Sequence, residues 1–202
     1  MREQYYEKLL NIKTLEEQKV FYQSLHYSTY EPTPYSALEI LCEQYNFTAE
    51  DSIIDFGCGK GRFNFYINHF FDSTVKGIEM NTFFYKESID NKRNYLKKHK
   101  KINDKINFLD CFAEEYNISP SDNKFYFFNP FSIHIFIKVI ENILNSVKEY
   151  KRTVDIILYY PSEEYIYFLN DNTPFVLFTE IKLPYLYDKN PRESFLIYRL
   201  VY

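Results

Sequence analysis

The sequence predicts a doubly wound α/β fold, a mostly parallel sheet with helices on both faces. Two observations predict it. From residue 52 onward, short apolar runs alternate with segments of helical periodicity. Three of the four glycines also lie together, between the first apolar run and the segment after it. A strand that leads through alternate glycines into a helix is typical of a nucleotide-cofactor loop, because the backbone turns tightly there and can approach a ligand.

Seven strands are expected, over residues 52–55, 74–79, 106–109, 124–129, 154–160, 175–183 and 195–202. The run at 124–129 is almost continuously apolar, as in a parallel strand that is covered on both faces. No convincing helix separates the last two runs. We therefore expect an antiparallel pair at the C-terminal end of an otherwise parallel sheet.

Helices are expected after the glycine loop and at 85–96, 133–147 and 162–169, with Ser162 as the N-cap of the last. Another helix is predicted to begin at Pro34, with Thr33 as its N-cap. The first 25 residues alternate charge with apolar residues, which is compatible with one or two helices that act as a lid or only pack. We accordingly divide the chain into a helical extension, 1–29, and a main domain, 30–202.

Composition and net charge argue against several classes of protein. The 202 residues include no apolar run near the ~18 that a membrane-spanning helix needs, and the N-terminal segment lacks the apolar core of a secretory signal. We expect a cytoplasmic protein without a membrane partner. The three cysteines and four histidines show neither disulfide nor metal-ligand spacing, so no metal site is predicted. A net charge of -4 gives no global basic footprint for nucleic acid.

Polar residues stand at the ends of the first four predicted strands, one at each: Asp55, Glu79, Asp110 and Asn129. The carboxyl ends of parallel strands meet at one edge of a sheet, where ligands bind in this fold class. A single acid after a strand is more often a helix cap or loop residue. Four such residues in register indicate a ligand site.

The stretch Asp55-Phe56-Gly57-Cys58-Gly59-Lys60-Gly61 contains the pattern acid-x-Gly-x-Gly-x-Gly, by which residues 30–202 resemble the class I S-adenosylmethionine-dependent methyltransferases. The resemblance implies a Rossmann-like fold, S-adenosyl-L-methionine as the cofactor, and a methyltransferase activity. A nicotinamide-dependent dehydrogenase is the competing interpretation. Its usual spacing is G-x-G-x-x-G, and the third glycine here comes one residue early.

The same resemblance implies roles for individual residues. The glycine loop would lie against the methionine part of the cofactor, Glu79 would bind the ribose, and Asp110 would accept from the adenine amino group. Met80 and either Cys111 or Phe112 would sandwich the adenine ring. The implied cofactor-binding residues are Asp55, Gly57, Cys58, Gly59, Gly61, Glu79, Met80, Asp110, Cys111, Phe112 and Asn129.

The segment Asn129-Pro130-Phe131 resembles the Asn-Pro-Pro-aromatic motif of methyltransferases that act on nitrogen, although Phe131 replaces the second proline. This resemblance implies that Asn129 and Phe131 are catalytic. In the alternative interpretation Asn129 caps the next helix, Pro130 begins it, and Phe131 belongs to the core.

The methyl acceptor stays open at this point. A small molecule or a protein is favoured, in a pocket made by residues 27–35, 129–132 and 159–161. A nucleic-acid base methyltransferase and a non-catalytic module that binds S-adenosylmethionine are the alternatives. Residues 86–105 hold eight Lys or Arg that could contact phosphates, but a solvated helix end explains such a cluster more simply.

Overall fold

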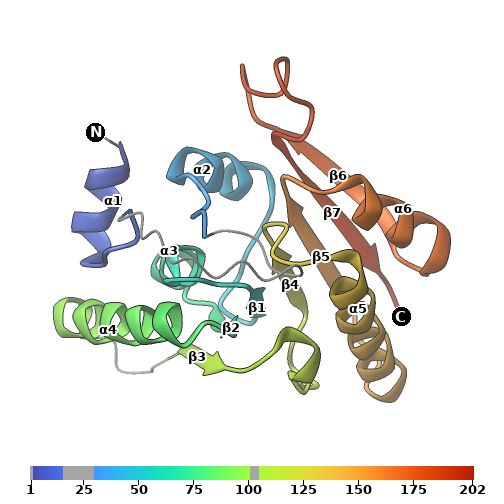
Figure 1. Ribbon diagram of the computed structural model, residues 1–202, viewed down its shortest axis with the longest axis horizontal. Coiled ribbons are helices and arrows are strands. Elements are labelled where there is room, and N and C mark those ends of the chain that lie inside the picture. The colour runs from blue at the N-terminus through green and yellow to red at the C-terminus, as the bar shows by residue number, and fades with distance from the viewer. Residues whose placement is uncertain (1, 16–29, 101–104) are drawn as a thin grey trace.

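The computed structural model describes residues 2–15, 30–100 and 105–202 (Figure 1). The helices are α1 (Arg2–Leu10), α2 (Tyr35–Gln44), α3 (Arg62–Phe71), α4 (Thr82–His99), the 3-10 turn η1 (Ala113–Glu115), α5 (Ile133–Glu149) and α6 (Glu163–Asn172). The strands are β1 (Ser52–Phe56), β2 (Thr74–Glu79), β3 (Ile106–Asp110), β4 (Lys124–Phe127), β5 (Val154–Tyr159), β6 (Val176–Lys182) and β7 (Ser194–Leu200).

The seven strands form one sheet in the order β3-β2-β1-β4-β5-β7-β6. The five strands from β3 to β5 are parallel to one another, and β7 runs antiparallel to both of its neighbours. This confirms the predicted parallel sheet with an antiparallel C-terminal pair. The strand order reverses between β1 and β4, so the loops after these two strands meet at the point where this fold class binds ligands.

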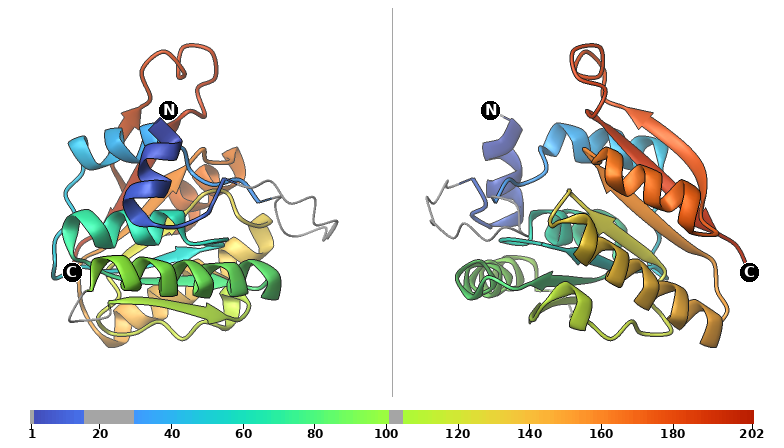
Figure 2. Two further views of the ribbon diagram at one scale, coloured as in Figure 1. Left: turned by 90° about the vertical axis from the view of Figure 1, so that its left-hand side faces the viewer. Right: turned by 45° about the vertical axis from the view of Figure 1, so that its right-hand side comes forward.

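Apolar side chains cover the sheet on both faces because successive residues of a strand point to opposite sides. Ile53 belongs to a core shared with helices α1 to α4, whereas Ile54 belongs to a second core under α5 and α6. In β4, Phe125 and Phe127 enter the second core and Tyr126 enters the first. Figure 2 shows the two helical layers on either side of the sheet.

Two of the predicted helix caps can be compared with the structure, and one of them is present. Ser162 caps α6 as predicted, because its hydroxyl accepts from the backbone N–H of Tyr165. Thr33 as the N-cap of α2 is wrong. Pro34 occupies that position, and the Thr33 hydroxyl is instead hydrogen-bonded to the hydroxyl of Tyr126. The side chain thus anchors the start of α2 to the central strand β4.

The N-terminal residues form α1 and an extended segment that ends at Leu15. Leu10 and Ile12 are buried in the same core as α2 and α3, so this part of the chain packs on the main fold. Residues 16–29, which include part of the predicted helical region and part of the predicted acceptor pocket, lie outside the described residues. Among the helices described, none is long and apolar enough to cross a membrane.

Candidate functional site

The glycine loop joins β1 to α3 and lies at the end of β2. The N–H groups of Gly57 and Cys58 both donate to the carbonyl of Ile78, at 2.9 and 3.2 Å. Gly57 and Gly59 have φ values of +76° and +54°, in the left-handed region that residues with a Cβ rarely adopt. The tight turn expected from the sequence is present.

Close packing also requires glycine at these two positions. A Cβ on Gly57 would lie 2.5 Å from the Cβ of Pro130, and a Cβ on Gly59 would overlap the ring of Tyr30. The loop is therefore in direct contact with the segment after β4 on one side and with Tyr30, in the segment before α2, on the other. Three segments that are far apart in the sequence meet at one place.

Glu79, at the end of β2, is bonded to the glycine loop. One carboxylate oxygen accepts from the N–H of Gly59 at 2.9 Å, and the other accepts from the N–H of Asn81 at 2.8 Å. The Asn81 side chain in turn accepts from the N–H groups of Phe83 and Phe84 and caps α4. Burial raises the pKa of Glu79, and the two N–H groups act in the opposite direction by stabilising the carboxylate.

Asp55 is the most unusual group of the site. Its side chain is 4% exposed. Burial raises the pKa of this carboxyl well above its usual range, and the negative charge of Glu79 raises it further. Among the described residues no cation or hydrogen-bond donor offsets these effects. A buried carboxyl group is costly without such a partner, so the site favours a positively charged ligand at this position.

The residues expected around an adenine ring lie at the rim of the site. Asp110 is directly opposite Glu79 in the register of β2 and β3, and its side chain is exposed. Phe112 is 45% exposed, while Met80 and Cys111 are half-buried. Cys58, by contrast, is buried inside the glycine loop, where burial raises the pKa of its thiol. Only its backbone is suited to contact a ligand.

The segment after β4 differs from the capping role that the alternative interpretation gave to Asn129 and Pro130. Strand β4 ends at Phe127, and Asn129 adopts a left-handed conformation with φ of +44°. Helix α5 has Ser132 as its N-cap residue, so the alternative in which Asn129 caps it is wrong. Pro130, which would have begun the helix, packs on Gly57 instead.

Phe131 is 5% exposed and packs in the core beside Phe127, with ring centroids 6.1 Å apart. This matches the core role in the alternative interpretation and leaves no open ring face for an acceptor. We therefore remove Phe131 from the predicted catalytic residues. Phe128 is half-buried, with its ring centroid 4.6 Å from that of Tyr159. Together with Tyr160 it forms an aromatic surface at the ends of β4 and β5.

Sequence reasoning placed Tyr30 in the acceptor-pocket segment 27–35 but did not predict its contact with the glycine loop, and it gave Arg62 no role. Tyr30 lies against Gly59, and its ring centroid is 4.8 Å from that of Phe84 at the start of α4. Arg62, the first residue of α3, is buried immediately after the glycine loop. A cation directly after a glycine motif was the available signal for Arg62. No group of three or more potential metal ligands occurs in the described parts of the chain.

No protein-family model and no curated protein matches the sequence. Solved structures do match the fold. PH1948 from Pyrococcus horikoshii is 18% identical, with a TM-score of 0.55 over 98% of this chain and 96% of that one. An RNA methyltransferase from Salinibacter ruber, in complex with S-adenosyl-L-homocysteine, is 17% identical, with a TM-score of 0.50 over 84% of this chain and 92% of that one.

A third similar structure is the geranyl diphosphate C-methyltransferase from Streptomyces coelicolor A3(2), with Mg²⁺, geranyl diphosphate and S-adenosyl-L-homocysteine bound. It is 13% identical, with a TM-score of 0.53 over 82% of this chain and 77% of that one. At these identities the likeness shows the fold. The chain has the same Rossmann-like fold as these solved structures.

Proposed function

We propose that this protein is a methyltransferase that uses S-adenosyl-L-methionine. The observation that carries the proposal is the Asp55 carboxyl, which is buried beside the glycine loop and Glu79 and has no cationic partner within residues 2–15, 30–100 and 105–202. S-adenosylmethionine brings an ammonium and a sulfonium group, which a negatively charged site stabilises. A nicotinamide dinucleotide would bring an anionic pyrophosphate toward these same carboxyl groups, which is unfavourable.

The described residues suit the remaining parts of this cofactor. Glu79 already accepts from two N–H groups, yet a carboxylate has about four acceptor positions, which leaves capacity for ribose hydroxyls. Asp110 at the rim would accept from the adenine amino group, and Met80, Cys111 and Phe112 would flank the ring. Two of the similar structures contain S-adenosyl-L-homocysteine, the product that this cofactor leaves.

In the proposed reaction the methyl carbon passes from the sulfonium sulfur to a nucleophile. The carbon–sulfur bond breaks as the new bond forms, and the electron pair stays on sulfur, which becomes neutral. The protein contributes mainly alignment, since in-line displacement needs the nucleophile about 3 Å from the methyl carbon. Asn129 is held beside the glycine loop by its neighbour Pro130, and we assign it the role of orienting the nucleophile.

We propose a small molecule or a protein side chain as the acceptor, bound against the aromatic surface of Phe128 and Tyr160. Support comes from these two half-buried rings, which offer apolar contact at the ends of β4 and β5, while the neighbouring ring of Tyr159 is buried. Part of the basic cluster in residues 86–105 is hydrogen-bonded within the protein. Lys98 donates to the carbonyls of Lys8 and Leu9, at the C-terminal end of α1. This makes an RNA acceptor the less favoured alternative.

Calorimetric titration with S-adenosylmethionine, S-adenosylhomocysteine and NAD⁺ tests the cofactor. We expect the first two to bind and the third not to bind. Transfer of a radiolabelled methyl group into fractionated small-molecule, protein and RNA pools then tests the acceptor. Binding of NAD⁺ alone would overturn the assignment, whereas tight binding of S-adenosylmethionine without transfer to any pool would indicate a non-catalytic module.

A further inference from the structure

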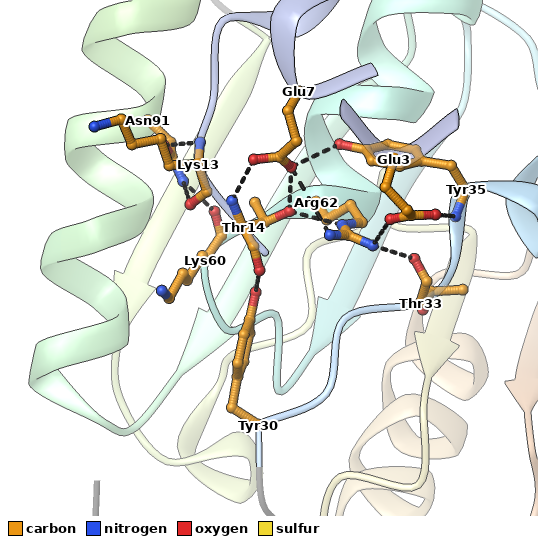
Figure 3. A network of polar contacts seen from close by, with 10 residues as sticks. All are labelled: Glu3, Glu7, Lys13, Thr14, Tyr30, Thr33, Tyr35, Lys60, Arg62 and Asn91. Carbon is orange, nitrogen blue, oxygen red and sulfur yellow. Dashed lines mark hydrogen bonds and ion pairs between the residues drawn. The ribbon is translucent and has the colours of Figure 1, made fainter. Parts of the chain in front are cut away.

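Arg62 connects the glycine loop to the N-terminal segment, residues 2–15, which we call the strap. Its Nε donates to the hydroxyl of Thr14 at 2.7 Å, and Nη1 is paired with the carboxylate of Glu3 at 2.7 Å. Nη1 also donates to the carbonyl of Thr33 at 3.2 Å. Figure 3 shows the guanidinium group at the centre of these contacts. The first residue of α3 is thereby bonded to both ends of the strap.

Glu7 closes the network from the strap side. Its carboxylate accepts from the N–H of Thr14 at 2.7 Å and from the hydroxyl of Tyr35 at 3.2 Å, and it lies 3.8 Å from Nη2 of Arg62 (Figure 3). The Arg62 and Glu7 side chains are both largely buried. Removing one partner of a buried ionic network leaves the others uncompensated, so each member holds the rest in place.

Two further contacts join the strap to the proposed cofactor site. The hydroxyl of Tyr30 donates to the carbonyl of Thr14 at 2.9 Å, while its ring lies on Gly59. The Asn91 side chain of α4 accepts from the N–H of Lys13 at 2.8 Å and donates to the carbonyl of Lys60, in the glycine loop, at 3.0 Å. The strap is thus bonded to Arg62 directly after the loop and to the hydroxyl of Tyr30, whose ring lies on the loop, and it is linked to the loop itself through Asn91.

We propose that docking of the strap and binding of the cofactor stabilise one another, with Arg62 as the positioning residue that links them. The inference rests on the proposed function. It adds that the strap, as well as the cofactor, stabilises the glycine loop. A loop held in its ligand-binding conformation by the strap binds ligand more tightly. Linkage then requires that bound ligand strengthen strap docking by the same factor. A strap that only completes the core would show no such coupling.

The test uses the full chain and S-adenosylhomocysteine as the probe. Glu7→Gln weakens the strap without altering any residue of the loop. Asp155→Asn is the matched control, because it also changes a buried carboxylate paired with an arginine, Arg199, but in a network remote from the loop. We expect Glu7→Gln to raise the Kd by about five- to fiftyfold and Asp155→Asn to leave it unchanged in folded protein.

Hydrogen exchange of residues 4–14 supplies an independent readout in the wild type. Saturating S-adenosylhomocysteine should slow this exchange by about the factor that Glu7→Gln loses in affinity. If Glu7→Gln does not fold, Tyr30→Phe replaces it, since that change removes only the hydroxyl bonded to Thr14. Ligand binding with unchanged strap exchange, or an unchanged Kd in the strap variant, overturns the coupling alone. No binding to the wild type overturns the proposed function and the coupling together.

Discussion

Replacing Glu79 by Gln tests the centre of the proposed cofactor site with almost no change in shape. The two carboxylate oxygens accept from the N–H groups of Gly59 and Asn81. A Gln amide can accept from only one of them, and its NH₂ group then faces the other N–H. The site also loses the negative charge that the ribose hydroxyls and the cationic cofactor favour. Hydrogen bonds to charged groups contribute about 1.5–3 kcal/mol each.

We expect the affinity of Glu79→Gln for S-adenosylhomocysteine to fall by about 1 to 3 kcal/mol, or about five- to 150-fold in Kd. The folding free energy should change less, by about 1 kcal/mol, because losing one N–H acceptor is offset by no longer burying a charge. Calorimetric titration well below the melting temperature measures the first quantity, and urea denaturation measures the second.

Asp90→Asn is the control for this experiment. Asp90 is also an acid, but it is exposed on α4, where it pairs with Arg93. The change should alter neither affinity nor stability measurably, since exposed ion pairs contribute little. A Glu79→Gln protein that is folded and binds within twofold of the wild type would refute the reasoning, because the ribose role would then have no support.

Three further predictions concern neighbouring residues. The raised pKa of Asp55 means that the folded protein retains a proton that the unfolded chain releases, so stability falls as pH rises above about 4. Asp55→Asn should flatten this decline in urea titrations and weaken S-adenosylhomocysteine binding at pH about 7; an unaltered pH dependence would contradict the assigned burial. Asn129→Gly and Asn129→Ala should both lower single-turnover methyl transfer by about ten- to a thousandfold. Only the alanine should also lose about 1 kcal/mol of stability, because of its left-handed backbone; a full-rate glycine variant would remove Asn129 from the site. Gly59→Ala should lower the melting temperature and the affinity together, since its methyl group meets Tyr30 in a strained backbone; unchanged ligand affinity would separate this glycine from the ligand.

Local sequence patterns were sufficient to predict most of the strands and helices. Glycines with positive φ, apolar runs and strand-end acids depend on neighbours within a few residues, and the structure has the glycine turn and the seven strands, although β4 ends at Phe127 and not at 129. The errors occurred where two local solutions competed. Thr33 is a good N-cap residue, but its hydroxyl is bonded to Tyr126, which lies 93 positions away in the chain. Asn129 was the expected cap of α5 in the alternative interpretation, but it adopts a left-handed turn, and the N-cap residue is Ser132.

The contacts of Arg62 could not be predicted for the same reason. Its partners Glu3 and Thr14 are 59 and 48 residues away, and no spacing rule connects them. The packing of Phe131 in the core likewise depends on where β4 ends, which the continuous apolar run did not reveal. The candidate site was therefore predictable as a set of strand ends, whereas the part contributed by the N-terminal segment required the tertiary structure.

The pairing of β1 with β4 determines when the candidate site can first form during folding. Ile53 lies opposite Lys124, with β2, β3 and three crossovers between them in the chain. Such distant parallel pairings form slowly, because the intervening chain must close into a loop before contacts between the two strands can offset the entropy that closure costs. During synthesis the glycine loop emerges early but lacks one of its flanking strands until β4 has left the ribosome. Any ligand that recognises this site can therefore stabilise the finished sheet, but it has no complete site to act on while the first half of the chain is still alone.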